Sequence, residues 1–243
     1  MERNKIKVEV DLPVLNEERV IEKSVTTLVD FLKKNCPYRW NIVVVDNGSS
    51  DRTPEIAKML SRKFKEVSYL RLEKRGRGRA LRTAWQKSNA DICSYMDVDL
   101  STDLNAFMPL INAIALEGND IATGSRLIKG AKIKRSFKRE LLSRVYVLML
   151  KSVLGIEFRD AQCGFKAVSR KVINDVLPLV LDQEWFFDSE LLFKAQRYNY
   201  KIKEIPVTWV EDKDSRVRIY KTSKNYILSI CRLRFEFWAN STR

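Results

Sequence analysis

The sequence predicts an α/β fold with a mostly parallel central sheet. In residues 1–125, apolar strand-like runs alternate with helix-like segments, which is typical of a parallel sheet covered by helices on both faces. A polar cluster follows the first, second and fourth of these runs, at 13–17, 46–51 and 97–101. Ligands of such sheets bind beyond the carboxyl ends of the strands. The clusters therefore stand where a binding site is expected.

The elements of this half are expected in regular alternation. Strands are predicted at 6–12, 42–46, 67–72, 92–97 and 121–123, and helices between them at about 17–35, 53–65, 77–89 and 103–117. The helix from 53 has clear start signals, because Ser50 or Asp51 can cap it and Pro54 is tolerated in a first turn.

The second half is less regular, but two of its segments have helical character. Residues 136–154 begin with a strongly basic stretch and carry apolar side chains at helical spacing, namely Phe137, Leu141, Leu142, Val145, Leu148 and Met149. Packing against the core and lying in a membrane interface both fit this pattern. Residues 220–238 interleave aromatic and basic residues in the same way. Neither segment has the run of about 18 apolar residues that a membrane span requires.

Composition narrows the chemistry. The chain has 243 residues, 45% of them hydrophobic, which is enough for a sizeable core in one domain. It has no histidine, so Ser-His-Asp and Cys-His machinery and His-ligated zinc are excluded. Acid–base chemistry must fall to carboxylates, Lys, Tyr or the substrate. The four cysteines form no C-x-x-C pair, so we expect free thiols in a reducing, cytosolic compartment.

The net charge of +14 is concentrated in two segments. Residues 129–151 carry eight Lys and Arg against one Glu, and residues 213–234 carry seven against one Asp. Two basic segments indicate two places that meet an anionic surface or ligand. Charge alone is compatible with nucleic acid, anionic lipid and a phosphorylated substrate.

Asp97 and Asp99 end the fourth strand-like run, one residue apart. Two carboxylates at this spacing can share one divalent cation, and Mg²⁺ or Mn²⁺ held in this way usually completes its shell with substrate phosphate oxygens. The pair therefore indicates a nucleotide-diphosphate substrate whose leaving group needs charge neutralisation. The alternative is that a strand-end aspartate caps the next turn.

Five motifs in the first half resemble those of family 2 glycosyltransferases in order and spacing. They are L-P-V-L-N-E-E at 12–18, V-D-N-G-S-S-D-R-T at 45–53, R-G-R-G-R-A at 75–80, D-V-D at 97–99 and G-S-R at 124–126. Three later strings resemble the polyprenyl-phosphate branch of that family: D-A-Q-C-G-F-K at 160–166, W-F-F-D-S-E-L-L at 185–192 and E-I-P-V at 204–207. The loop at 75–79 is not a full dinucleotide-binding G-x-G-x-x-G.

The resemblance implies a GT-A type fold in one domain, 1–243, with a nucleotide-sugar-binding half at 1–125 and an acceptor half at 126–243 that includes both amphipathic helices. It implies an inverting transfer of a hexose from UDP-glucose or GDP-mannose to a polyprenyl or dolichyl phosphate, with Mg²⁺ or Mn²⁺ as cofactor. A saccharide hydroxyl acceptor is the alternative within the fold. A basic nucleic-acid-binding module is a remote alternative, and no nucleic-acid partner is expected because no such motif is visible.

The resemblance also assigns residues to the nucleotide sugar. Those expected to contact it are Pro13, Leu15, Glu17, Asp46, Asn47, Arg79, Asp97, Val98 and Asp99. Asp46 is expected to accept hydrogen bonds from the base, and Arg79 to face either a phosphate or solvent. The metal is expected to bind Asp97, Asp99 and Ser101, and to assist departure of the diphosphate as a Lewis acid.

The catalytic residues implied are Asp188 and Arg126. Asp188 is the expected base, with Asp160 second, although a lipid phosphate is already an anion and needs positioning more than deprotonation. Glu190 could instead orient its helix or a neighbouring arginine. The acceptor phosphate is expected to meet Arg126, Arg218 and Lys224.

A lipid acceptor would explain both basic segments. A polyprenyl phosphate keeps its tail in the bilayer and its phosphate at the surface, so the acceptor side of the enzyme must lie against anionic headgroups. Each basic residue beside such a surface contributes on the order of 1 kcal/mol. We therefore expect peripheral attachment at the cytoplasmic face of a membrane, through residues 132–151 and 218–238.

Overall fold

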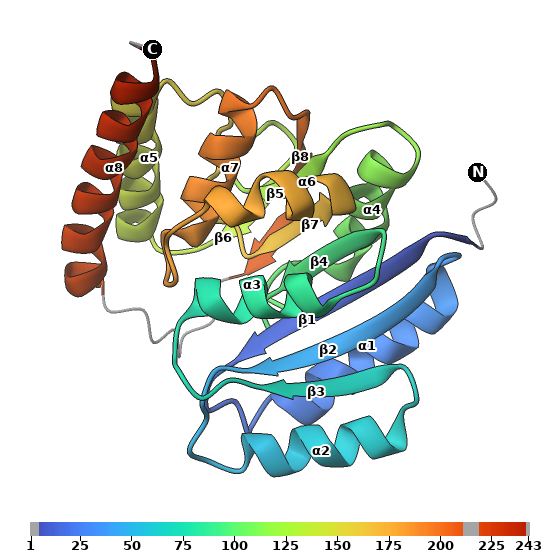
Figure 1. Ribbon diagram of the computed structural model, residues 1–243. Coiled ribbons are helices and arrows are strands. Elements are labelled where there is room, and N and C mark those ends of the chain that lie inside the picture. The colour runs from blue at the N-terminus through green and yellow to red at the C-terminus, as the bar shows by residue number, and fades with distance from the viewer. Residues whose placement is uncertain (1–4, 211–218, 242–243) are drawn as a thin grey trace.

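A seven-stranded sheet forms the centre of the described molecule (Figure 1). The computed structural model describes residues 5–210 and 219–241, and within them the side chains at 137–138, 219–224 and 238–241 lie outside the description. The strand order is β3-β2-β1-β4-β7-β5-β8. The bounds are β1 Lys7–Val14, β2 Arg39–Asp46, β3 Val67–Arg71, β4 Ile92–Met96, β5 Ile121–Ser125, β7 Phe165–Ser169 and β8 Ile202–Pro206.

Neighbouring strands of this sheet run parallel except at β7, which is antiparallel to both β4 and β5. The prediction of a mostly parallel sheet is confirmed, and so are the five strands expected in residues 1–125. The sheet also takes β7 and β8 from beyond residue 125. A separate parallel pair joins β6 (Lys132–Lys134) to β9 (Thr208–Val210).

Helices cover both faces of the sheet (Figure 1). One face packs on α1 (Ile21–Asn35), α2 (Thr53–Lys63) and α4 (Phe107–Ala115), and the other on α3 (Arg77–Lys87), α6 (Arg170–Asp175) and α7 (Phe187–Arg197). In β2, Ile42 and Val44 enter the first core while Val43 and Val45 enter the second, because successive side chains of a strand point to opposite faces. A strand buried on both faces accordingly has a continuous apolar sequence.

The helix predicted from residue 17 begins at Ile21 instead. Asn16 has a left-handed φ of 57°, and the Glu17 carbonyl accepts hydrogen bonds from the Val20 and Ile21 amides. Residues 17–20 therefore form a turn that leads into α1. This turn places Glu17 at the carboxyl edge of the sheet, outside the helix.

Helices α5 (Phe137–Leu154) and α8 (Ile219–Ser241) pack side by side at the outside of the second face (Figure 1). Tyr146 of α5 is buried, and its ring centroid lies 5.1 Å from that of Tyr226 in α8. Most of the apolar face predicted for α5 points away from the core and is exposed. The residues Leu141, Leu142, Val145 and Leu148 are 41–64% exposed. Core packing, one of the two interpretations of this face, is therefore wrong for these four residues, although Met149 does pack against the core.

Helix α8 exposes apolar side chains as well, at Ile227, Leu228 and Phe235. Within the described ranges, no helix combines the length and apolar character needed to cross a bilayer. We call the exposed apolar residues of α5 and α8 the outer apolar face, comprising Leu141, Leu142, Val145, Leu148, Ile227, Leu228 and Phe235.

Candidate active site

The carboxyl ends of β1, β2 and β4 meet at one edge of the sheet. The register pairs Val14 with Asp46 and Asp11 with Tyr95, so Asp46, the last residue of β2, and Asp97, just after β4, lie on either side of β1. The three polar clusters predicted from the sequence therefore come together. We call this edge the nucleotide site.

Residues 13–17 and 46–53 form one wall of the nucleotide site. The Asn16 amide donates to Ser49 Oγ at 2.9 Å, and the Ser50 amide donates back to Asn16 Oδ1 at 2.8 Å. Pro13, Leu15 and Glu17 are half-buried beside these bonds. The backbone of this segment is thus fixed, while its side chains lie at the surface of the wall. Their contact with a nucleotide stays a prediction.

Asp46 is fully buried, and its carboxylate is held by three donors. The Ser49 amide donates to Oδ1 at 2.8 Å, and Tyr69 Oη and Arg71 Nη1 donate to Oδ2 at 2.7 and 3.0 Å. An ionised carboxylate offers about four acceptor positions, so these bonds use most of them. Asp46 braces the turn that follows β2, and its acceptance of a hydrogen bond from a base is untested.

The glycine-rich loop at 75–79 is bonded to protein through its own amides. Asn47 Oδ1 accepts from the Gly76 amide at 2.7 Å, and the Gly78 and Arg79 amides donate to the carbonyls of Glu184 and Gln183 at 3.2 and 3.0 Å. Helix N-terminal amides often bind phosphate, but these amides already have protein acceptors. The loop therefore joins the nucleotide site to residues 183–184.

The two glycines of this loop are needed because its backbone packs closely against Gln183 and Phe187. A Cβ at Gly76 would lie 2.5 Å from the Gln183 carbonyl oxygen, and one at Gly78 would lie 2.7 Å from Phe187 Cβ. The Arg79 guanidinium donates to the Arg75 carbonyl. Its expected contact with a phosphate stays a prediction, as does that of Asn47 with the nucleotide.

Arg77 and Asp97 form an ion pair, with 2.6 Å between Nη2 and Oδ1. The guanidinium lies over the rings of Tyr95 and Trp185, 5.4 and 5.0 Å from their centroids. Burial lowers the pKa of Arg77, but neighbouring negative charge, above all that of Asp97, raises the pKa above its usual value. Arg77 therefore stays charged. No sequence pattern singled out this arginine.

The turn at 97–101 presents the D-V-D pair. Leu100 has a left-handed φ of 51°, and its amide donates to the Asp97 carbonyl at 3.1 Å. The Ser101 amide donates to Asp99 Oδ1 at 3.0 Å, while Val98 is buried. Asp99 therefore caps this turn, as the alternative interpretation stated. Capping uses one acceptor position and does not prevent metal binding.

The oxygens of this turn fit a hard divalent cation. The carboxylates of Asp97 and Asp99, with the Ser101 hydroxyl close in sequence, are ligand types that Mg²⁺ and Mn²⁺ prefer. In the part of the chain that the structure describes, no group of three His, Cys, Asp or Glu side chains gathers at one point. Two carboxylates would thus leave most of the coordination shell to phosphate oxygens. A Cβ on Gly164 would lie 2.0 Å from Asp97 Oδ2, so this glycine gives the carboxylate its place.

Comparison with known proteins decides the family. The model for "Glycosyl transferase family 2" matches residues 10–177. The chain belongs to glycosyltransferase family 2. The resemblance found in the sequence motifs is confirmed.

Curated relatives of this glycosyltransferase cover most of the chain. Glycosyltransferase AglD of Haloferax volcanii is 35% identical over 218 residues, which are 89% of this chain and 35% of AglD. The dolichyl-phosphate beta-glucosyltransferase of Dictyostelium discoideum is 28% identical over 96% of this chain and 75% of its own length. The human dolichyl-phosphate beta-glucosyltransferase is 30% identical over 86% of this chain and 68% of its own length. The chain thus spans about a third of AglD.

Solved structures agree on the fold. Glucosyl-3-phosphoglycerate synthase from Mycobacterium tuberculosis, in complex with UDP, matches 93% of this chain with a TM-score of 0.70 at 20% identity and 80% coverage of that chain. The complex of that enzyme with Mn²⁺ and UDP-glucose matches 95% of this chain with a TM-score of 0.68 at 18% identity and 79% coverage. The predicted GT-A type fold of the glycosyltransferase is confirmed.

Tyr95 connects the nucleotide site of this glycosyltransferase to α7. Its hydroxyl donates to Asp188 Oδ1, and Lys166 Nζ lies 3.4 Å from the same oxygen. Burial, followed by the charge of Asp188, raises the pKa of Tyr95 well above its usual value. The buried Asp188 carboxylate is therefore held by the neutral Tyr95 hydroxyl and by the Lys166 ammonium. Its role as a catalytic base stays a prediction.

Arg126 is bonded to Asp160 in a bidentate arrangement. Its Nε and Nη2 lie 2.7 and 2.9 Å from the two carboxylate oxygens, and its amide donates to Oδ2 at 3.0 Å. Burial raises the pKa of Asp160, but Arg126 outweighs it and holds that pKa below its usual value. Two of the three guanidinium nitrogens of Arg126 are thus bonded to Asp160. The expected contact of Arg126 with the acceptor phosphate stays a prediction.

A pocket of about 490 Å³ opens beside Arg126. Its charged walls are Arg126, Arg135, Arg144 and Glu140, and its apolar walls are Leu127, Ile128, Ala131 and Ile133. Glu140 ion-pairs with both Arg135 and Arg144, and Asp160 pairs with Arg126 from behind, so three arginines are balanced by two carboxylates and the pocket keeps a net positive charge. Helix α5 contributes Glu140 and Arg144 to this pocket and also carries part of the outer apolar face.

Two predicted acceptor residues cannot be compared with this geometry. Arg218 lies outside the described residues, and so does the side chain of Lys224. In contrast, Arg77, Lys166 and Arg135 come into the site although the sequence analysis did not select them. The R-G-R-G-R string was the one available signal for Arg77. Lys166 ended the D-A-Q-C-G-F-K string, and Arg135 lay in the basic segment 129–151 with no pattern beyond its charge.

Proposed function

We propose that this chain transfers glucose from UDP-glucose to a polyprenyl or dolichyl phosphate at the cytoplasmic face of a membrane. The observation that carries the acceptor assignment is the pocket beside Arg126, where three arginines and one glutamate meet an apolar wall. A net positive pocket suits a phosphate monoester, and an apolar wall suits the first carbons of a lipid tail. The names of the dolichyl-phosphate glucosyltransferases among the relatives support the same acceptor.

The donor would lie on the nucleotide site. Asp97 and Asp99 would hold Mg²⁺ or Mn²⁺, which, when bound, neutralises charge on the departing diphosphate. Arg77 brings a second, permanent positive charge to the same place. Structures of glucosyl-3-phosphoglycerate synthase with Mn²⁺ and UDP-glucose support a divalent metal in a site of this fold.

The reaction itself needs orientation more than proton removal. A phosphate oxygen of the acceptor forms a bond to the anomeric carbon, the bond from that carbon to the diphosphate oxygen breaks, and the configuration inverts. Because the attacking oxygen is already anionic, the arginines of the pocket serve to hold it in line. Asp188 lies at the Tyr95 hydroxyl, where it could accept a residual proton from the phosphate.

The outer apolar face supports attachment to the membrane surface. Leu141, Val145 and Leu148 of α5 and Phe235 of α8 are exposed, and basic residues accompany them in both helices. Apolar side chains that enter the interface and basic ones that meet anionic headgroups act together in peripheral binding. The acceptor pocket shares α5 with this face, so a lipid phosphate could reach it from the bilayer.

Transfer of radioactive glucose from UDP-glucose in the presence of Mn²⁺ tests the proposal. We expect turnover with polyprenyl phosphate in bicelles and none with polyprenol, 3-phosphoglycerate or free saccharides. Arg144→Met should raise the acceptor KM about tenfold, equivalent to about 1.4 kcal/mol, because it removes one exposed cation of the pocket. Lys203→Met, which removes an exposed cation paired with Glu117, is the matched control. Turnover with a saccharide while the lipid phosphate stays inert would overturn the acceptor assignment.

Sedimentation with vesicles tests the membrane part separately. Val145→Glu with Leu148→Glu should reduce binding to vesicles containing phosphatidylglycerol about tenfold or more. Met59→Glu, at an exposed apolar residue of α2, should leave binding unchanged. Equal binding by the double variant and the unaltered protein would exclude the outer apolar face as the contact.

A further inference from the structure

Glu190 is a buried carboxylate at which three segments of the chain meet. It lies in the first turn of α7 and is fully buried. The amides of Leu181 and Asp182 donate to its two oxygens at 3.0 and 2.9 Å. Arg232 of α8 donates to both oxygens at 2.9 and 2.7 Å. Helix α8 is thus bonded, through one carboxylate, to the backbone that precedes α7.

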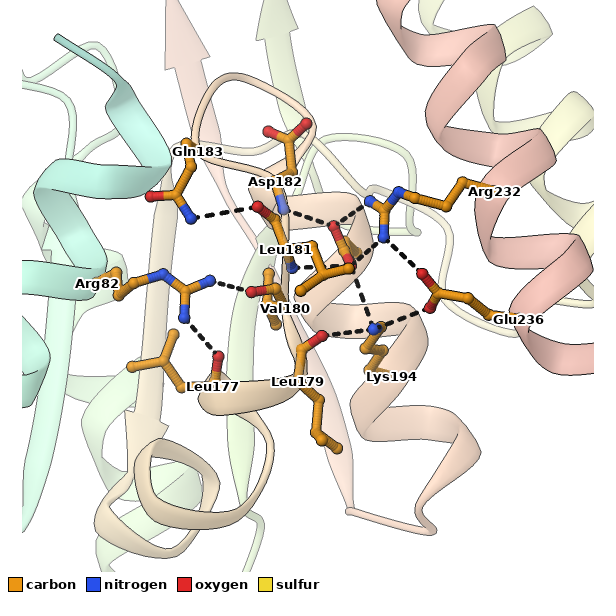
Figure 2. Close-up of polar contacts among 11 residues, drawn as sticks. Arg82, Leu177, Leu179, Val180, Leu181, Asp182, Gln183, Lys194, Arg232 and Glu236 are labelled. Atoms are coloured by element: carbon orange, nitrogen blue, oxygen red, sulfur yellow. Dashed lines mark hydrogen bonds and ion pairs between the residues drawn. The ribbon is translucent and has the colours of Figure 1, made fainter. Parts of the chain in front are cut away.

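Other side chains fix the beginning of the same segment (Figure 2). Arg82 of α3 donates to the carbonyls of Leu177 and Val180, and Lys194 of α7 donates to that of Leu179. Figure 2 shows Arg82 reaching the segment from one side and Lys194 from the other, with Arg232 and Glu236 on the same side as Lys194. We call residues 177–185 the clasp segment. Its backbone is held by side chains of α3 and α7, and through Glu190 by α8.

The other end of the clasp segment is bonded to the nucleotide site. The carbonyls of Gln183 and Glu184 accept from the Arg79 and Gly78 amides. The Gly76 and Gly78 positions leave no room for a Cβ against Gln183 and Phe187, so the fit is close. Trp185 then covers the Arg77 guanidinium, with 5.0 Å between the cation and the ring centroid. A shift of Gln183 and Glu184 would therefore move the loop that carries Arg77.

We propose that Glu190 and Arg232 are positioning residues for the nucleotide site. Through the clasp segment, the pair sets the place of residues 76–79 and of Arg77 beside Asp97. Neither side chain is proposed to contact the donor itself. This role rests on the proposed function only for the identity of the donor, UDP-glucose. A displacement of about 1 Å in a catalytic site can reduce turnover about a hundredfold, so small movements of the clasp segment matter.

The pair is separable from the general packing of α8. Arg232 and Lys194 also bond to Glu236, at 3.0 and 3.1 Å, one turn further along the same face of α8. Glu236→Gln weakens the contact between α8 and α7 but leaves the Glu190 bonds to Leu181 and Asp182. Arg232→Met removes the charge and keeps the length of the side chain. Arg232→Lys keeps the charge without the bidentate geometry.

Amide hydrogen exchange is the first readout, and it needs no substrate. We expect Arg232→Met to speed exchange in residues 76–80, where the Gly78 and Arg79 amides are bonded to the clasp segment, and to leave exchange in β4 unchanged. Arg232→Lys should give an intermediate rate, and Glu236→Gln should match the unaltered protein. Faster exchange confined to α7 and α8 would overturn the proposal. Glu190→Gln is a second probe, to be used if a cooperative melting transition shows that this variant is folded.

Kinetics give the second readout. Arg232→Met should raise the donor KM about tenfold and leave the KM for polyprenyl phosphate within about twofold, a split that a general loss of stability would not produce. Equal increases in both KM values would overturn the positioning role. If the unaltered protein fails to turn over any donor, the proposed function fails, whereas the exchange result still decides the role of Glu190 and Arg232.

Discussion

Arg77 and Asp97 are joined by an ion pair of 2.6 Å at the centre of the nucleotide site. Arg77 comes from the first turn of α3 and Asp97 from the end of β4. The arginine holds one carboxylate of the pair that is proposed to bind the metal, and the rings of Tyr95 and Trp185 enclose its guanidinium. A cation fixed at this distance competes with a divalent ion for the same oxygen.

Replacement of this arginine should strengthen metal binding in the nucleotide-free protein. In Arg77→Met, the competing charge beside Asp97 is gone, so we expect the dissociation constant for Mn²⁺ to fall about tenfold, or about 1.4 kcal/mol. Titration followed by electron paramagnetic resonance measures the free Mn²⁺. Arg75→Met, at an exposed arginine of the same loop, should have little effect. Weaker Mn²⁺ binding in Arg77→Met would indicate that Arg77 orients Asp97 for the metal and does not compete with it.

Gly164 is predicted to be essential for the same carboxylate. A Cβ at this position would lie 2.0 Å from Asp97 Oδ2, so Gly164→Ala must displace Asp97. We expect a loss of about 1–3 kcal/mol in the free energy of unfolding, the usual cost of overpacking, and loss of Mn²⁺ binding. Gly118→Ala is the control, because its Cβ meets no atom within 4 Å and strains only a backbone with φ of +70°. It should lose stability and retain the metal, so loss of the metal in both variants would contradict the prediction.

The sequence predicted the nucleotide half well because its signals are local. In β2, the run Ile42–Val45 is apolar on both faces of one strand, and Asp46 follows where the strand ends. Asp97 and Asp99 could be selected for the same reason, since their spacing and the preceding strand lie in one stretch of sequence. These signals place side chains at an edge without reference to any distant partner.

The remaining features depend on partners far away in the chain. The pairing of Arg126 with Asp160 follows from β7 entering the sheet antiparallel between β4 and β5. The contacts of Arg77 with Asp97 and Trp185 bring α3 against the end of β4 and the clasp segment. No local pattern predicts either arrangement. The outward orientation of the apolar face of α5 could not be predicted either, because helical periodicity shows that apolar residues share a face but not which way that face points.

Asp188 is predicted to be needed for turnover beyond its structural role. Asp188→Asn should lower kcat about 10²- to 10⁴-fold if the carboxylate accepts a proton, with the donor KM unchanged. Tyr95→Phe removes only the hydroxyl that donates to Asp188 and should cost about tenfold or less. Steady-state kinetics with varied donor measures both effects.

Asp188→Asn also leaves the fully buried Lys166 without its anion, which lowers stability in its own right. The double variant Asp188→Asn with Lys166→Met removes that uncompensated charge. Its melting temperature should recover relative to Asp188→Asn, while its turnover should not. Recovery of both would show that Asp188 contributes only through folding.

The Arg126–Asp160 pair should make stability depend on pH in a defined window. The pKa of Asp160 in the folded protein is lowered, because Arg126 outweighs the effect of burial, whereas in the unfolded chain it is about 3.9. The folded state therefore binds fewer protons in acid, and the stabilisation by the carboxylate is present above about pH 4. As the pH falls through the folded pKa, that stabilisation is lost.

Asp160→Asn should accordingly be less stable than the unaltered protein by about 3–5 kcal/mol at pH 7, because it leaves the buried Arg126 unpaired. The difference should shrink below about pH 4 and approach zero once Asp160 is protonated in both states. Urea unfolding at pH 7, 5, 4 and 3 measures it. Glu117→Gln, which breaks the exposed pair with Lys203, should change stability by no more than about 1 kcal/mol. A difference for Asp160→Asn that grows in acid would mean that the folded protein raises, and does not lower, the pKa of Asp160.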